Sequence, residues 1–277
     1  MRIDAHQHFW RVDRGDYGWL NPADHPAICR DFGPEDLAPL IADAGVERTI
    51  LVQAAPTLEE TRFLLDLARR TDFVAGVVGW VDLAAPDAAV VIANLARDPK
   101  LVGLRPMLQD LPDDGWILGA DLALPLKTLQ TTGLRFDALV KPRHLPYLAA
   151  FLAAHRDLPV VIDHGAKPDI ARGERGGWAD AIAAIGRDTH AYCKLSGLVS
   201  EAAADWKEAD LRPYFDVLLQ AFGPGRLMWG SDWPVVNEAG GYAAWRAAAE
   251  ALTEVCSAAD REWIFGRSAQ TFYGIGA

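Results

Sequence analysis

The sequence predicts an α/β fold, a single (β/α)8 TIM barrel that spans residues 1–277. Eight short runs rich in Val, Ile and Leu alternate with amphipathic segments, as expected for a parallel sheet that helices cover. The length of 277 residues suits a fold that typically takes about 250. No Gly-x-Gly-x-x-Gly motif opens a helix after a strand, which weighs against the alternative, an open doubly wound sheet.

The eight apolar runs give the expected strands in chain order. They are Ile3–His8, Thr49–Gln53, Val74–Trp80, Val102–Pro106, Arg135–Val140, Val160–His164, Ala191–Leu195 and Leu227–Ser231. In such a barrel the carboxyl ends of the strands meet at one face, and active sites lie there.

Helix signals stand between these runs. Thr57 and Glu60 have the spacing of a capping box at a helix start. Gly45 and Gly133 stand where helix C-terminal caps are expected. Further helices are predicted over Leu145–Arg156, Leu211–Phe222 and Tyr242–Val255.

Composition excludes several classes of protein. The net charge of −11 makes the chain a poor binder of nucleic acid and of anionic membranes. The three cysteines form no C-x-x-C pair, which argues against a disulfide framework or a cysteine zinc site. We find no signal-peptide core and no run of 18 apolar residues, so we expect a cytoplasmic enzyme.

Polar residues follow the ends of the expected strands. His6 and His8 are two residues apart on a strand, so both imidazoles point to the same face. Two imidazoles on one face can hold a divalent metal ion, and His164 and Asp232 can complete its ligands. The alternative is a pair of half-buried histidines that hydrogen-bond at the barrel rim.

Seven motifs in order resemble the sugar-lactonase branch of the amidohydrolase superfamily. They are DAHQHFW, LVQAAPTLEET, VVGWVDL, LVGLRPMLQD, VIDHGAKP, YCKLSGLV and RLMWGSDWPV, which extend over nearly the whole chain. This branch contains L-fuconolactonases, L-rhamnonolactonases and relatives of pyrone-dicarboxylate lactonase. The resemblance implies a distorted (β/α)8 barrel that opens the ester ring of a sugar-acid lactone.

The resemblance also implies roles for single residues. His6 and His8 match the metal ligands of the first strand, His164 matches the histidine of the DH-A-G-K-P motif, and Asp232 matches the general base of the last strand. The chain departs from this pattern where Gly and Ala exchange places in DHGAKP. It also has Lys194 where a histidine is expected, and no bridging lysine or glutamate is recognisable. One divalent ion, zinc by preference, is therefore implied, with metal-free catalysis as the alternative.

Lactone hydrolysis needs an activated water and a group that stabilises the oxyanion. A divalent ion makes hydroxide available at neutral pH, and Asp232 can accept the proton and deliver it to the ring oxygen. Arg105, Lys194 or the metal can stabilise the oxyanion. The alternatives are a loop cap for Asp232 and structural ion pairs for Arg105 and Lys194.

Four further residues are candidates for substrate binding. Trp10, Trp80 and Trp233 follow strand ends, where an indole face can cover the C–H face of a sugar. Gln53 can bond substrate hydroxyls, or it can hold a neighbouring loop. Trp19 lies in a long first loop that could act as a lid. The histidines at 25, 144, 155 and 190 are expected at the surface.

Three functions remain open. The first is a sugar-acid lactonase, whose partner is a small lactone and which can form a homo-oligomer. The second is a non-oxidative decarboxylase of the same superfamily, or a lactonase that acts on a pyrone or muconolactone. The third is a barrel that only binds a sugar. Acid release from lactones, compared with release of CO2, separates the first two.

Overall fold

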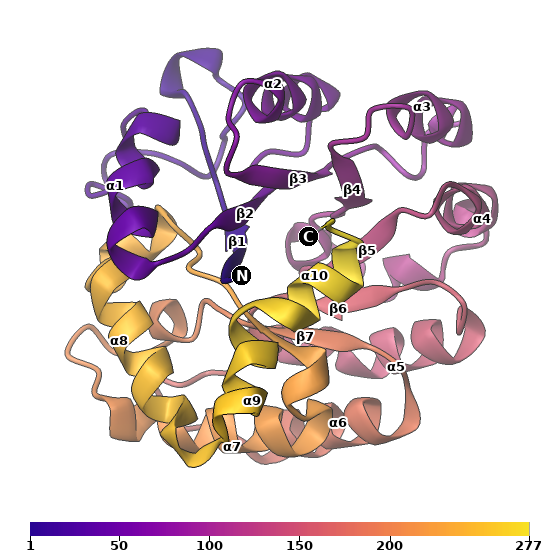
Figure 1. Ribbon diagram of the computed structural model, residues 1–277. Coiled ribbons are helices and arrows are strands. Elements are labelled where there is room, and N and C mark those ends of the chain that lie inside the picture. The colour runs from indigo at the N-terminus through magenta and orange to yellow at the C-terminus, as the bar shows by residue number, and fades with distance from the viewer. Residues whose placement is uncertain (277) are drawn as a thin grey trace.

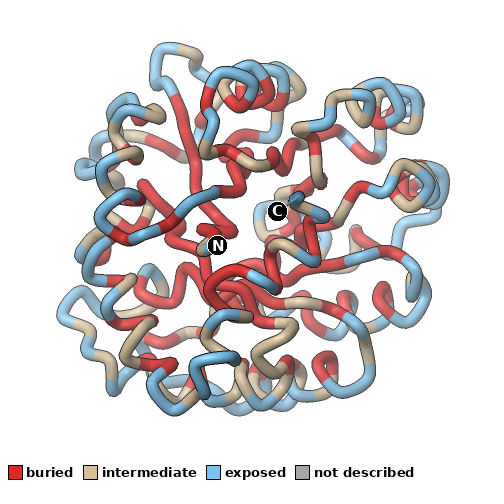
Figure 2. Tube along the Cα trace, in the orientation of Figure 1, coloured by how far each residue is buried: buried red, intermediate tan, exposed pale blue. Residues whose placement is uncertain are grey.

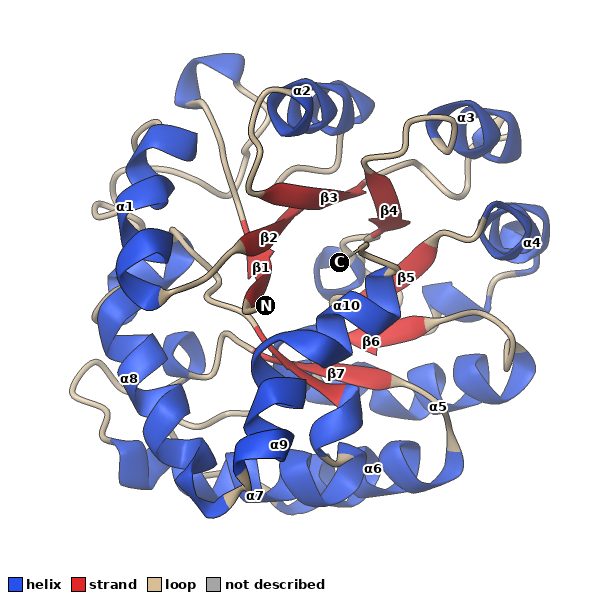
Figure 3. Cartoon of the chain, in the orientation of Figure 1, coloured by secondary structure: helices blue, strands red, loops and turns tan. Residues whose placement is uncertain are grey.

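The computed structural model describes residues 1–276 and contains one parallel sheet of eight strands. The strands pair in chain order around a central axis, and the helices lie outside them (Figures 1 and 3). They are β1 (Ile3–Gln7), β2 (Arg48–Val52), β3 (Val74–Gly79), β4 (Leu101–Leu104), β5 (Arg135–Ala138), β6 (Val160–Ile162), β7 (Tyr192–Leu195) and β8 (Leu227–Trp229). This nearly closed arrangement is a distorted (β/α)8 barrel, as predicted.

The helices follow the strands in alternation and then continue beyond β8. They are α1 (Pro34–Ala44), α2 (Leu58–Arg69), α3 (Ala88–Leu95), α4 (Ala123–Thr132), α5 (Leu145–Ala154), α6 (Gly176–Asp188), α7 (Glu208–Phe222), α8 (Tyr242–Leu252), α9 (Ala258–Glu262) and α10 (Ser268–Tyr273). None of the helices within residues 1–276 combines the length and the apolar character that a membrane span requires.

The first and last strands meet at a seam in the barrel. β1 and β8 form no regular ladder, but His8 N donates to Trp233 O at 2.7 Å and Asp232 N donates to His6 O at 2.8 Å. The buried Asp4 carboxylate reinforces the seam, because its Oδ1 accepts from Ser231 N at 2.8 Å. The seam therefore brings the histidines of β1 next to Asp232.

Apolar side chains fill two layers. The larger layer lies between the strands and the surrounding helices, and the smaller one fills the barrel interior. In Figure 1, α10 crosses the opening at which the strands begin. Its Phe272 and Tyr273 pack with Ile3 and Ile50 of the interior layer. Helix α10 thus closes this end and leaves the opposite end for ligands.

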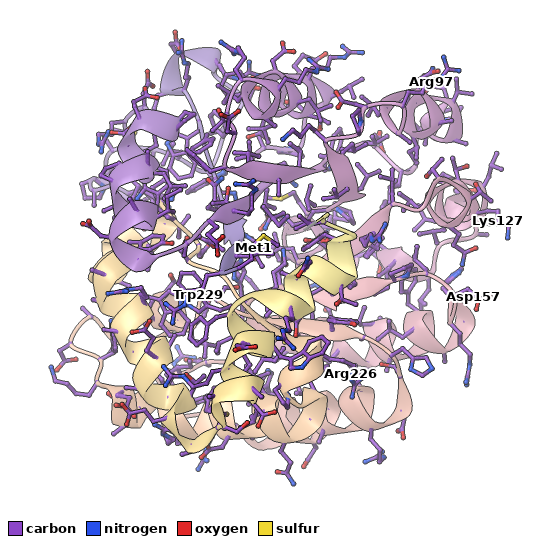
Figure 4. The ribbon with its side chains drawn as sticks, in the orientation of Figure 1. Met1, Arg97, Lys127, Asp157, Arg226 and Trp229 are labelled. Atoms are coloured by element: carbon purple, nitrogen blue, oxygen red, sulfur yellow. The ribbon has the colours of Figure 1, made fainter. Side chains whose placement is uncertain are left out.

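Burial follows the same division. The buried residues in Figure 2 concentrate on the strands and on the inner faces of the helices. In Figure 4, Arg97, Lys127 and Asp157 lie at the periphery and point away from the barrel. Trp229 lies inside the helix layer, against the rings of Tyr242 and Phe265 at 5.9 and 5.8 Å.

All eight predicted strands are confirmed, with ends that differ by at most two residues. Gly45 and Gly133 are left-handed helix caps with φ of 64° and 75°, as predicted. Only one of the two hydrogen bonds of the predicted capping box is present. Thr57 Oγ1 accepts from Glu60 N at 3.0 Å, but the Glu60 carboxylate instead accepts from Ala54 N and Ala55 N in the loop after β2.

Candidate functional site

Three histidines and one aspartate meet at the carboxyl end of the barrel. His8 Nε2 lies 3.2 Å from His6 Nε2 and 3.3 Å from Asp232 Oδ1. Asp232 Oδ1 is 3.7 Å from His6 Nε2 and 3.9 Å from His164 Nε2. All four side chains are buried. The structure therefore brings together the four residues that the sequence proposed as metal ligands.

The hydrogen bonds of His8 fix which ring nitrogen is free. His8 Nδ1 lies 2.7 Å from the carbonyl oxygen of Val52, which only accepts. Nδ1 must therefore carry the proton, and the lone pair of Nε2 points at His6 and Asp232. A backbone carbonyl behind a ligating imidazole is the usual way in which proteins orient such a ligand.

The spacing of these donors fits a divalent cation. Donors in tetrahedral contact with zinc, at about 2.0–2.1 Å from it, are about 3.3 Å apart. The separations of 3.2 and 3.3 Å around His8 match this value, and the separation of 3.7 Å is close to it. His6, His8 and Asp232 form one possible ligand group, and His6, Asp163 and His164 form another.

The backbone that presents His164 and Asp232 is in an unusual conformation. His164, Lys167 and Asp232 have φ of 54°, 50° and 58°, in the left-handed region that costs L-residues roughly 1–2 kcal/mol each. Such conformations concentrate at functional sites, where packing holds them in place.

Gly197 allows a close approach to His164. A Cβ atom at position 197 would lie 2.6 Å from His164 Nδ1, so any larger residue would displace the ring. The neighbouring hydroxyl of Ser196 lies 2.8 Å from the same Nδ1 atom. This contact orients His164 so that its Nε2 atom faces Asp232.

Burial sets the charge states in the cluster. Burial lowers the pKa of His164 to about 4, against the opposing influence of Asp232. Burial and then the Lys194 ammonium lower the pKa of His6 well below its ordinary value. Burial alone would raise the pKa of Asp232, but the imidazole of His164 and its other neighbours bring it well below the usual range. Neutral imidazoles and an ionised carboxylate are the forms that bind a metal.

A network of charged groups lies directly beneath the cluster. Lys194 Nζ is 2.6 Å from Asp137 Oδ2, 3.0 Å from Asp163 Oδ1 and 3.1 Å from His6 Nδ1. Arg105 Nη1 lies 3.2 Å from Asp163 Oδ2 and 3.4 Å from His6 Nε2. Asp163 thus connects both cations to the histidine cluster.

A cavity of about 270 Å³ opens above the cluster. His8, His164 and Asp232 form part of its wall, and Arg105 and Lys167 add positive charge. The remaining side of the cavity includes Trp19, His25, Ala54, Met107, Gln109, Asp110, Leu139 and Val235. A small molecule in this cavity would contact Asp232 directly.

The sequence profile of the amidohydrolase family matches residues 3–275. The chain belongs to this family. The match runs from the first strand through α10, so it includes every residue of the cluster.

Two curated relatives of this amidohydrolase carry the same name. It is 49% identical over 279 residues to an L-fucono-1,5-lactonase of Burkholderia ambifaria, with 99% of this chain and 96% of the relative covered. It is 40% identical to an L-fucono-1,5-lactonase of Burkholderia multivorans, with the same coverage. A crystal structure of a Burkholderia multivorans amidohydrolase with bound zinc superposes with a TM-score of 0.94, at 39% identity and with 100% of both chains covered.

The structure places the three predicted tryptophans of the amidohydrolase away from the cavity above the histidine cluster. Trp10 and Trp233 are buried, and neither lines the cavity. Trp10 donates from Nε1 to Arg30 O at 2.8 Å and packs on Phe32, while Trp233 packs on Phe9 and Phe32. Trp80 lines a different, adjoining cavity. The first two indoles follow strand ends but are part of the core under the first loop.

Two other candidates lie deeper than the predicted substrate contacts would require. Gln53 is fully buried and donates from Nε2 to Arg105 O at 2.8 Å, so it holds the neighbouring strand end. Lys194 is fully buried among carboxylates and does not line the cavity. The predicted direct contact of Lys194 with an oxyanion does not fit this position.

The sequence analysis did not identify several residues of the site, or predicted another location for them. Asp163 and Lys167 flank His164 in the DHGAKP motif, and this adjacency was the available signal. Trp19, which the sequence placed only in a possible lid loop, lines the cavity wall. Of the histidines expected at the surface, His144 is buried, and His25 lines the cavity with its Nδ1 3.0 Å from Glu238 Oε2.

Proposed function

We propose that this amidohydrolase hydrolyses the ester ring of a sugar-acid lactone, with Asp232 as the general base. One observation carries the proposal. The Asp232 carboxylate is held ionised at the wall of the cavity, with Oδ1 turned to the Nε2 atoms of His6, His8 and His164. An ionised carboxylate beside an open cavity can take a proton from a water that enters it.

Asp232 would act twice in one turnover. It accepts a proton as the water oxygen attacks the lactone carbonyl carbon, which forms a new C–O bond and a tetrahedral oxyanion. The bond between this carbon and the ring oxygen then breaks, and Asp232 returns the proton to the ring oxygen. The products are a hydroxyl group and a carboxylic acid, so the reaction consumes one water and leaves Asp232 as it began.

Cationic side chains suit the oxyanion and the acidic product. Arg105 lines the cavity, and Asp163 holds its guanidinium at 3.2 Å. Lys167 also lines the cavity, and its Nζ lies 3.7 Å from Glu201 Oε1. We assign carbonyl polarisation to Arg105 and contact with the product carboxylate to Lys167. Lys194 instead has a positioning role, through Asp163 and His6.

His6, His8, His164 and Asp232 are the residues that would hold a divalent ion. When bound, such an ion supplies positive charge that stabilises the developing oxyanion. Zinc is the ion we propose, because imidazole and carboxylate donors suit it and because the Burkholderia multivorans amidohydrolase was crystallised with zinc.

The names of the relatives guide the choice of substrate. We propose L-fucono-1,5-lactone first, on the basis of the two relatives named L-fucono-1,5-lactonase. L-rhamnonolactone comes second, because the motifs resemble a branch that also contains L-rhamnonolactonases. Both lactones are neutral and carry hydroxyl groups. The half-buried indole of Trp19 and the polar groups of His25 and Asp110 suit such a ring.

A pH-indicator screen of aldonolactones tests the proposal. We expect the wild-type protein to release acid from L-fucono-1,5-lactone and to lose most of this activity after dialysis against a chelator. Added zinc should restore it. Asp232→Asn should lower kcat by about 10²–10⁴-fold with an unchanged circular dichroism spectrum. Release of CO2 from aromatic acids without lactone hydrolysis would favour a decarboxylase, and sugar binding without any turnover would favour a binding protein.

A further inference from the structure

A second cavity of about 550 Å³ adjoins the one that contains the histidine cluster. Trp19, Met107 and Asp110 line both cavities, so they form a shared wall. We propose that the second cavity binds a second sugar ring, so that the preferred substrate is a lactone that carries a glycosyl substituent. This proposal rests on the proposed lactonase function, since it extends the substrate of the same site.

The walls of the second cavity suit the apolar face of a sugar. Three half-buried indoles, those of Trp19, Trp80 and Trp116, line it together with Val81 and Leu111. Indole rings cover the C–H face of a pyranose, and their N–H groups bond hydroxyls. A cluster of solvent-accessible aromatic side chains in one hollow usually marks a binding site.

The Trp19 ring and the backbone of Trp80 are held in place before any ligand binds. Trp19 Nε1 donates to Ala54 O at 2.8 Å, which fixes the shared wall. The backbone of Trp80 is held by Thr61, whose Oγ1 accepts from Trp80 N at 2.7 Å and donates to Trp80 O at 2.8 Å. A preformed wall reduces the ordering cost of binding.

The charges of the second cavity favour a neutral polyhydroxylated ligand. Asp16, Asp82 and Asp110 line it, and none of the described lining residues is a Lys, Arg or His. Asp16 pairs with Arg14, but no ion pair within residues 1–276 involves Asp82 or Asp110. Asp82 Oδ1 accepts from Ala84 N at 3.0 Å and Asp110 Oδ2 accepts from Gln109 Nε2 at 3.4 Å. Each carboxylate keeps lone pairs that can accept from hydroxyls, and its charge repels anions. A sugar phosphate or a uronic acid is therefore a poor occupant, and a neutral glycosyl ring is a good one.

The shared wall explains how one substrate would reach both cavities. The lactone ring occupies the cavity beside Asp232, and its glycosyl substituent passes over Trp19 and Met107 into the second cavity. The scissile ester stays next to the histidine cluster. The second ring adds binding surface without any change to the reaction.

The test compares two lactones that share one reactive ring. One is the 1,5-lactone of L-fuconic acid, and the other is the lactone made by oxidation of a disaccharide whose reducing sugar is L-fucose. We expect kcat/KM to be about tenfold higher for the disaccharide lactone, which is the effect of one stacked ring. Trp80→Ala and Trp116→Ala should abolish this preference and leave kcat/KM for the monosaccharide lactone within about twofold.

Trp263→Ala is the matched control, because Trp263 is also half-buried but lies outside both cavities. It should keep the preference. Equal kcat/KM for both lactones in the wild-type protein would overturn the proposal, and so would an equal loss on both in Trp80→Ala. An aryl ether of the monosaccharide lactone serves as a further comparison. If its kcat/KM rises as much as that of the disaccharide lactone, the assignment of the second cavity to a sugar ring is overturned. Conversion of a dimer to a monomer by Trp80→Ala would show that a second copy of the chain occupies the cavity.

Calorimetry separates failure of this proposal from failure of the proposed function. The unoxidised disaccharide and free L-fucose are titrated into the wild-type protein and into Trp80→Ala. About tenfold tighter binding of the disaccharide, lost in Trp80→Ala, supports the second subsite even if no lactone is hydrolysed. Equal binding of the two sugars overturns it, whatever the hydrolysis assay shows.

Discussion

The Lys194 ammonium lies 2.6 Å from the Asp137 carboxylate, and neither side chain has any surface exposed to solvent. Tyr273 of α10 donates to the same carboxylate oxygen at 2.7 Å, and Asp163 lies on the other side of the ammonium. The helix that closes one end of the barrel is thus linked through Asp137 and Lys194 to the histidine cluster at the other end.

Lys194→Met should destabilise the protein strongly. The substitution removes the cation that the buried Asp137 and Asp163 carboxylates share, and loss of one partner of a buried ion pair costs about 3–5 kcal/mol. Urea unfolding measures the change. The double variant Lys194→Met/Asp137→Leu should recover part of the loss. No recovery would mean that the cost arises from packing rather than from unpaired charge.

Asp163→Asn should weaken metal binding more than Asp137→Asn does. Both carboxylates bond Lys194, but only Asp163 also approaches His6 Nδ1, at 3.6 Å, and Arg105. Loss of a carboxylate behind a ligating histidine typically lowers metal affinity about 10–100-fold. Competition with a chromophoric chelator gives the zinc affinity directly. An equal loss in both variants would show that the whole network, and not Asp163 through His6, controls affinity.

Trp10 and Trp19 are in contact, with ring centroids 5.6 Å apart, but we expect their substitution to act on different properties. Trp10→Phe should lower the free energy of unfolding by about 1–3 kcal/mol, because it removes the hydrogen bond from Nε1 to Arg30 O and leaves a void. KM should stay unchanged. Trp19→Phe should raise KM several-fold, because it alters the cavity wall and frees Ala54 O. A raised KM in Trp10→Phe would restore the sugar-stacking role that its burial argues against.

Glu60 should make stability depend on pH. Burial raises its pKa from an ordinary 4.5 to about 7, although the N–H groups of Ala55 and Ala54 oppose this shift. Between these values the unfolded chain releases a proton that the folded protein retains, so stability falls as pH rises and levels off above about 7. The loss has an upper limit of roughly 3 kcal/mol.

Glu60→Gln isolates this contribution because glutamine does not titrate. Urea unfolding at pH 5 and pH 8 should show a smaller decrease in the variant than in the wild-type protein. Identical pH dependence in both would mean that the Glu60 carboxylate ionises normally in the folded state. Glu60 also holds Ala54, which lines the cavity. Glu60→Gln should therefore change KM for the lactone as well.

The strands and the cluster were predictable because they depend on local patterns. Apolar runs mark buried parallel strands, and His6, His8, His164 and Asp232 stand at their carboxyl ends, which the fold collects at one face. The fold and the four clustered residues therefore follow from sequence positions alone.

Pairings between distant side chains were not predictable. Nothing at position 137 indicates that its carboxylate bonds Lys194 rather than a ligand, because strand neighbours are set by the closed sheet. The cavity-lining position predicted for Trp10 and Trp233 was wrong for a related reason. Trp10 and Trp233 follow strand ends, but the first loop covers both rings, and the path of a long loop leaves no periodic trace in the sequence.

The seam between β1 and β8 has a consequence for how the protein matures in the cell. The histidines of β1 and Asp232 are separated by 224 residues along the chain, counted from His8. A ribosome that makes this protein produces His6 and His8 almost at once but adds Asp232 only near the end of translation. The four proposed metal ligands cannot all be present in a nascent chain that ends before Asp232, so metal binding and activity should begin together, when the barrel closes.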